Sequence, residues 1–139
     1  MSRPRPPALR LYLWAVGVLL LVQGLVSLLV RAAGLDAHAT SRLLSDPAHA
    51  TIHVVWGVVV LGVLVARAGE RVEILVASVF GVFYLGLLAL GIAVHHPFGL
   101  MIDAKENVFH AVIAVAALVV AVHAGVSRRR MPADVVEAR

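Results

Sequence analysis

The chain has 139 residues, of which 61% are hydrophobic and only 14% are charged. Soluble domains carry about 25% charged residues, so the composition predicts an integral membrane protein. The absence of cysteine excludes disulfides, thiolate zinc sites and iron–sulfur clusters. Lys and Arg (12) outnumber Asp and Glu (8), but the basic residues lie at the ends of apolar runs. We interpret them as a topology signal and exclude nucleic acid as a partner.

Four apolar runs are long enough, or nearly so, to cross a hydrocarbon core as helices, which takes about 20 residues. They are Leu11–Val30, Ala50–Ala66, Ile74–Val94 and Val108–Val126. Strand-type alternation is absent, so the sequence predicts an all-α, polytopic four-helix membrane bundle. We expect a transmembrane domain at residues 11–127 between tails at residues 1–10 and 128–139.

The basic residues are divided unevenly between the two sides of these spans. Nine arginines fall on the side of the termini, and two arginines with one lysine fall on the other. Because cytoplasmic segments carry the positive excess, we predict a plasma or inner membrane protein with both termini in the cytoplasm. The polar segments 32–49 and 95–106 then face outward.

Polar residues mark features of the helices in chain order. Gln23 is the only strongly polar residue inside the first helix and is expected to hydrogen-bond a neighbouring helix. Gly34 is expected to end that helix, because glycine commonly follows a helix C-terminus. Asp46 and Pro47 suit the N-cap and first position of the second helix, and Asp103 suits the N-cap of the fourth.

The start of the second helix recurs 57 residues later, at the start of the fourth. The informative matches involve Gly, His and Asp, and they pair Gly24 with Gly81, Gly34 with Gly91, His38 with His95, Asp46 with Asp103 and His53 with His110. We predict two parallel helical-hairpin repeats, at about 13–67 and 70–124, that both start inside.

Each copy of this motif places an acid, a second polar residue three positions on and a histidine seven positions on along one helix face. The histidines then lie about 10 Å below the helix starts, where ionisable groups usually face the bundle interior. We therefore predict an outward-facing site between the second and fourth helices, with His53 and His110 close together. The predicted metal ligands are His49, His53, Glu106 and His110. The predicted rim and supporting residues are Asp46, Asp103, His38, His95 and Tyr84.

Three functions are compatible with this pattern. The i, i+4 pairs His49/His53 and Glu106/His110 suit Zn²⁺ or another divalent transition metal. Alternatively, the acids are only caps, and the histidines tie helices together in a structural or accessory protein. A third reading is an electron-transfer protein that ligates haem through His53 and His110.

No enzyme signature occurs in the sequence, so we predict a binding or accessory role rather than catalysis. The lipid bilayer is the expected partner. A second copy of the chain or another membrane protein is left open as a further partner.

The second helix carries His49, His53 and Gly57, and the fourth carries Asn107 and His110. In this pattern the chain resembles a family of small four-helix bacterial membrane proteins that are frequent in actinobacteria and form a domain of unknown function. Their second helix starts with Asn or Asp and His, continues with His and Gly, and has a similar counterpart in helix four. The resemblance covers roughly Leu11–Gly125 and implies the architecture without an activity.

Overall fold

The computed structural model describes residues 7–35, 46–94 and 104–129. These residues form four helices, namely α1 (Pro7–Ala32), α2 (Pro47–Val65), α3 (Glu70–Ala93) and α4 (Ala104–Arg129). No strand occurs among them, which confirms the all-α prediction. Each helix is long and apolar enough to cross a membrane, so the fold indicates a membrane protein.

The first helix differs from its predicted bounds. It begins at Pro7, earlier than the predicted start at Leu11, so the predicted tail at residues 1–10 is partly helical. Proline is favourable in the first helical turn, where its missing N–H leaves no bond unmade. Leu9 is fully buried, and this burial explains why the helix continues back to that point. At the other end of the chain, α4 continues to Arg129, past residue 127.

Two of the predicted helix ends are confirmed. Asp46 is the N-cap of α2, and its side chain accepts a hydrogen bond from the backbone N of His49 at 3.0 Å. Gly34 has a φ of 67°, and the backbone N of Leu35 donates to the carbonyl of Val30 at 3.0 Å. This bond is typical of a Schellman motif, in which only glycine adopts the left-handed conformation without strain. Asp103, the expected cap of α4, lies outside the described residues.

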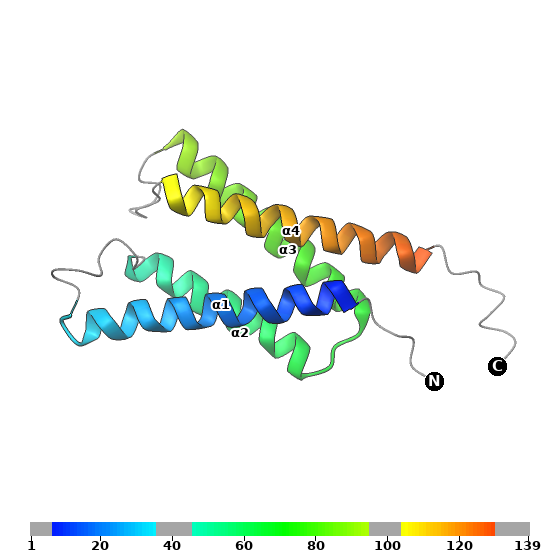
Figure 1. Cartoon of the computed structure of the whole chain (residues 1–139), viewed down its shortest axis with the longest axis horizontal. Helices are drawn as coiled ribbons and strands as arrows, with labels where there is room; N and C mark the ends of the chain where they lie inside the picture. The colour runs from blue at the N-terminus through cyan, green and yellow to red at the C-terminus, as the bar shows by residue number, and fades with distance from the viewer. Residues whose placement is uncertain (1–6, 36–45, 95–103, 130–139) are drawn as a thin grey trace, which may run out of the picture.

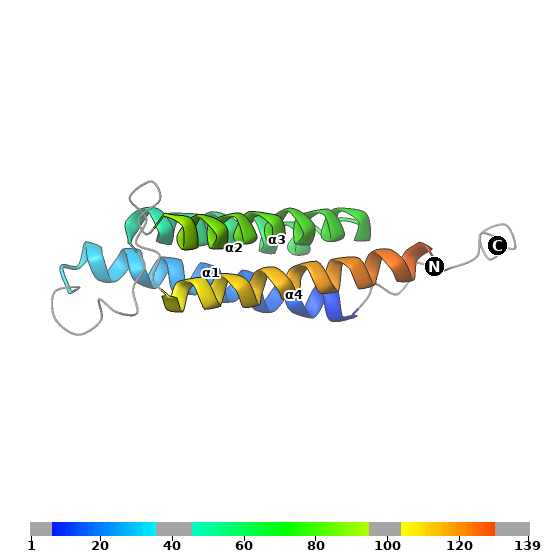
Figure 2. The ribbon, with the colours of Figure 1, turned by 90° about the horizontal axis from the view of Figure 1, so that it is seen from above.

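The four helices form a bundle of two hairpins. Contacts are most extensive between α1 and α2 and between α3 and α4. Figure 1 shows the α3–α4 hairpin above the α1–α2 hairpin, and Figure 2 shows α2 and α3 in one layer with α1 and α4 in the other. The two views place α2 and α4 at opposite corners. The start of α1, the α2–α3 turn and the end of α4 lie at one end of the bundle (Figure 1).

Glycines let the helices of each hairpin approach closely. A Cβ on Gly57 would lie 2.8 Å from the main-chain N of Leu21, and one on Gly24 would lie 2.6 Å from the carbonyl O of Ala50. In the second hairpin, a Cβ on Gly81 would lie 2.7 Å from the Leu118 side chain. Close approach at small residues is the usual way to pack helices in lipid. Gly24 and Gly81 are equivalent in the predicted repeat, although the duplication itself stays a prediction.

Apolar side chains cover the outside of the bundle, while several polar groups lie inside it. Many exposed valines and leucines lie at mid-helix, including Val58 at 56% and Val115 at 54%. Exposed apolar surface on this scale is unusual for a soluble monomer and fits a lipid environment. Within residues 7–35, 46–94 and 104–129, the buried polar residues are Ser27, His49, His53, Glu73 and His110.

Candidate metal site

Three buried histidines meet in the interior of the bundle, close to the starts of α2 and α4. His49 and His110 are fully buried, and His53 is 2% exposed. His49 and His53 lie one turn apart on the same face of α2, and His110 comes from α4 at the opposite corner. One ring nitrogen from each of the three residues lies within 4.8 Å of the other two, so the cluster could hold a metal ion.

The closest pair of imidazoles joins the two hairpins. The Nε2 atoms of His49 and His110 are 3.1 Å apart, and their ring centroids are 5.1 Å apart. The ring centroids of His53 and His110 are 6.3 Å apart, and those of His49 and His53 are 4.5 Å apart. The sequence placed His53 and His110 as the central pair, whereas His49 makes the closer contact with His110 in the structure.

Polar groups outside the cluster favour one tautomer for each of the two α2 histidines, through a hydrogen bond to His53 and a nearby carboxylate for His49. His53 Nδ1 donates to Oε1 of Gln23 on α1, since a side-chain amide oxygen can only accept. The Nε2 atom of His53 therefore carries a free lone pair. His49 Nδ1 lies 3.5 Å from a carboxylate oxygen of Glu106, which favours a hydrogen on Nδ1 and a lone pair on Nε2. Outer carboxylates and carbonyls orient the imidazole ligands of metal sites in the same way.

These tautomers assign the proton between His49 and His110. With the hydrogen of His49 on Nδ1, as the Glu106 carboxylate favours, its Nε2 accepts and His110 Nε2 donates in their 3.1 Å contact. His110 Nδ1 is then an acceptor, and it has no hydrogen-bond partner in the part of the chain that the structure describes. Two nitrogens bound to one tetrahedral Zn²⁺ at 2.0–2.1 Å lie about 3.3 Å apart. A divalent ion can therefore lie between the two Nε2 atoms with little movement of these two rings, once the hydrogen on His110 has moved from Nε2 to Nδ1.

The other predicted site residues take different positions. Glu106 faces Nδ1 of His49 and so lies on the side of that ring away from His110; its role as a direct ligand stays a prediction. Asp46 caps α2 through the backbone of His49. Tyr84 is fully buried, with its ring centroid 5.1 Å from that of His110. The rim residues Asp103, His38 and His95 lie outside the described residues.

A buried acid at the opposite end of the bundle was not predicted from the sequence. Glu73 of α3 has no exposed surface, and its Oε1 lies 3.6 Å from Nε of Arg10 on α1. The buried residues of α3 recur at intervals of three and four, at Glu73, Ala77, Phe80, Gly81, Tyr84, Leu87 and Gly91. This helical period could have identified Glu73 as facing the core.

Comparisons of the chain with family models, curated proteins and solved structures found no match. The resemblance inferred from the sequence stays a prediction, and the function is argued from the geometry of the site.

Proposed function

We propose that the chain is an integral membrane protein that binds a divalent transition metal through His49, His53 and His110. The observation that carries this proposal is the convergence of three buried ring nitrogens from α2 and α4 within 4.8 Å of one another. Polar groups inside a membrane protein are costly unless they are paired, and they commonly mark functional sites. His53 Nε2 and His110 Nδ1 have no hydrogen-bond partner among the described residues.

The donor set narrows the class of metal. Imidazole nitrogen suits Zn²⁺, Cu²⁺, Ni²⁺ and Fe²⁺, and it is a poor ligand for Mg²⁺ or Ca²⁺. Three protein ligands leave a fourth position of a tetrahedral ion for water or for a further ligand. Zn²⁺ is the first ion to test. The proposal is a binding or accessory role, and it includes no reaction.

The position of the cluster along the helices supports a site that opens to the extracytoplasmic side. His53 is six residues after Pro47, so it lies about 9 Å from the start of α2 at 1.5 Å per residue. The described basic residues concentrate at the other end of the bundle, where α1 begins, α2 joins α3 and α4 ends (Figure 1). Since positive residues favour the cytoplasmic side, the histidines face the outer side.

The haem alternative is disfavoured by the position of His49. A haem ligated by His53 and His110 would place its porphyrin ring around the midpoint between those two rings. His49 is nearer to each of them, at 4.5 and 5.1 Å between ring centroids, than they are to each other at 6.3 Å. Its side chain therefore occupies space that the porphyrin would need.

The alternative of a purely structural role keeps the contacts among the histidines, Gln23 and Glu106 described above, and it needs no ion.

Elemental analysis of the purified full-length protein, reloaded with Zn²⁺, tests the proposal. The wild-type protein should bind one ion per chain, and the double variant His53→Ala with His110→Ala should bind none. His123→Ala on α4 is the matched control, since His123 is exposed and its loss should leave the stoichiometry unchanged. If the wild-type protein holds no metal after loading with Zn²⁺ and with Cu²⁺, the metal proposal is wrong and the structural role of the histidines remains. A Soret absorption band that depends on His53 and His110 would favour haem.

A further inference from the structure

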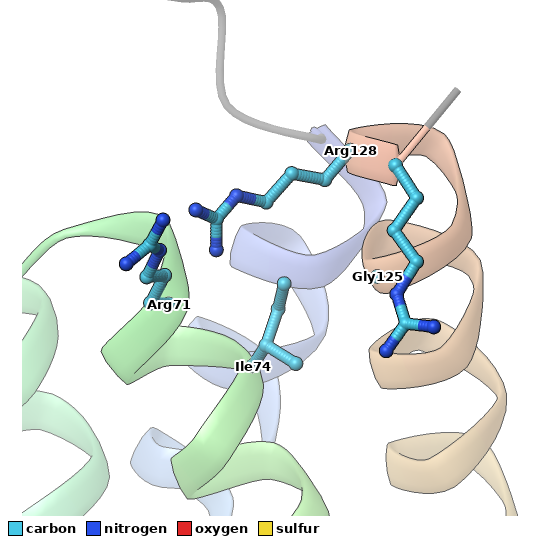
Figure 3. Close-up of a pocket in the computed structure, with 5 residues that line it drawn as sticks. Arg71, Ile74, Gly125 and Arg128 are labelled. Carbon is cyan, nitrogen blue, oxygen red and sulfur yellow. The ribbon is translucent and has the colours of Figure 1, made fainter. Parts of the chain in front are cut away.

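A pocket lined by three arginines lies at the end of the bundle opposite to the histidines. Its lining residues are Arg71 and Ile74 of α3 with Gly125, Arg128 and Arg129 of α4, and its volume is about 480 Å³. Figure 3 shows Arg128 reaching from α4 toward Arg71 on α3, with Ile74 beside them. The start of α3 and the end of α4 thus place like charges around one open space.

The pocket gathers positive charge without an acid among its lining residues. None of the three arginines forms an ion pair with a residue in the described ranges. Two acids lie in the first turn of α3. Glu73 is buried, with its Oε1 3.6 Å from Nε of Arg10 on α1, and Glu70 is not among the residues that line the pocket. Like charges held close together repel one another, so an anion between the guanidinium groups would relieve this repulsion.

The pocket lies at the ends of two candidate membrane spans, where a bilayer around the bundle would present its phosphate groups. It lies at the first turn of the candidate span of α3 and the last turn of that of α4. Guanidinium groups bind phosphate oxygens in a two-pronged geometry, and anionic lipids attract basic residues at this depth. Gly125 leaves room in the pocket wall, because a Cβ added there would meet nothing within 4 Å. Ile74 offers an apolar surface to the carbon atoms next to a phosphate.

We propose that Arg71, Arg128 and Arg129 form a binding site for a phosphate-type anion, supplied by an anionic lipid headgroup or by soluble phosphate. This site is independent of the proposed metal site, because the two lie at opposite ends of the bundle.

Native mass spectrometry of the full chain in detergent tests this site, with phosphatidylglycerol as the anionic probe and phosphatidylcholine as the neutral one. Each arginine near a membrane surface contributes about fivefold to the affinity for anionic lipid. The variant Arg71→Gln with Arg128→Gln should therefore bind phosphatidylglycerol about 25-fold more weakly. Arg31→Gln removes the same kind of charge at the other end of the bundle and should bind normally.

The variant Gly125→Leu distinguishes binding inside the pocket from general attraction of the lipid to the positive charges. It fills the pocket while keeping all three arginines, so it should weaken the binding of phosphatidylglycerol severalfold with the net charge unchanged. Competition by inorganic phosphate would identify a soluble anion as the ligand, and failure of phosphate to compete would identify the lipid. Equal binding of the two lipids, or unchanged affinity in Gly125→Leu, would overturn the proposal. Circular dichroism confirms that each variant is folded.

Discussion

The Nε2 atoms of His49 and His110 lie 3.1 Å apart, although their helices occupy opposite corners of the bundle. Neither hairpin contains the complete histidine cluster, because α2 supplies two imidazoles and α4 supplies the third. The site therefore exists only when the two hairpins are packed together. A metal ion bound there would link them and would favour the assembled bundle over its separated hairpins.

The first prediction is that Zn²⁺ stabilises the folded protein. A ligand that binds only the folded state at 100 times its Kd contributes about 2.7 kcal/mol, so saturating Zn²⁺ should raise the unfolding temperature in detergent. Trp56 packs against Phe80 at a ring-centroid distance of 5.2 Å, so its fluorescence, measured in a Trp14→Phe background, reports on contact between α2 and α3. His110→Ala should abolish the shift, while His123→Ala should keep it. An equal shift in His110→Ala would show that Zn²⁺ binds elsewhere.

The second prediction concerns the carboxylate behind His49. Glu106 Oε1 lies 3.5 Å from His49 Nδ1, where it can orient the imidazole and hold its tautomer. Loss of such an outer partner costs about 10- to 100-fold in metal affinity. Glu106→Gln should therefore weaken Zn²⁺ binding within that range while the stoichiometry stays at one, as measured by competition with a chromogenic chelator. Loss of all binding in Glu106→Gln would instead make Glu106 an essential ligand.

The third prediction concerns Gln23, the acceptor for His53 Nδ1. Gln23→Leu removes this acceptor, so His53 loses the bond that fixes its tautomer and directs its Nε2 lone pair to the cluster. The Zn²⁺ affinity should fall by about 10- to 100-fold. Gln23→Glu keeps an oxygen acceptor at the same position and should retain most of the affinity. The same chelator competition measures both variants, and wild-type affinity in Gln23→Leu would contradict this role.

The four-helix architecture could be predicted from the sequence because it depends on features of short segments. Apolar runs of membrane-spanning length, the Asp46 cap and the glycine after α1 each depend on a short stretch of chain. The expected bond between Gln23 and a neighbouring helix is also present, with His53 as the partner. The predicted start of α1 at Leu11 is wrong because the prolines before it are typical of a disordered tail, whereas α1 begins at Pro7 and Leu9 packs inside the bundle.

The contacts within the site were less predictable than its residues. Helical spacing predicts that His49, His53 and His110 face the interior, but the pairing depends on how α2 and α4 are rotated across the bundle. That rotation depends on contacts between different helices, which spacing along one helix does not encode. Hence His49, and not His53, makes the shortest contact with His110. Glu106 lies near His49 of the other hairpin, at the level one turn above the deeper histidines that helical spacing gives to both residues.

The fourth prediction tests whether helix approach at glycine holds the first hairpin together. A Cβ on Gly57 would lie 2.8 Å from the main-chain N and the Cβ of Leu21 on α1, whereas one on Gly62, also in α2, would meet nothing within 4 Å. Alanine is about 1 kcal/mol more favourable than glycine inside a helix, so Gly62→Ala should be neutral or stabilising. Gly57→Ala must push α1 away from α2, and overpacking of this kind costs about 1–3 kcal/mol.

The free energy of unfolding, measured by chemical denaturation in mixed micelles, should therefore fall for Gly57→Ala and stay equal or rise for Gly62→Ala. The same contrast is expected in α3, where a Cβ on Gly81 would lie 2.7 Å from Leu118 and one on Gly86 would meet nothing within 4 Å. The Leu118 side chain can move and the main chain of Leu21 cannot, so Gly81→Ala should cost less than Gly57→Ala. Because the hairpin contact also positions His49 and His53, Gly57→Ala should lower the Zn²⁺ affinity, and Gly62→Ala should not. Equal stabilities of the two α2 variants would show that α1 and α2 do not approach as closely as the structure has them.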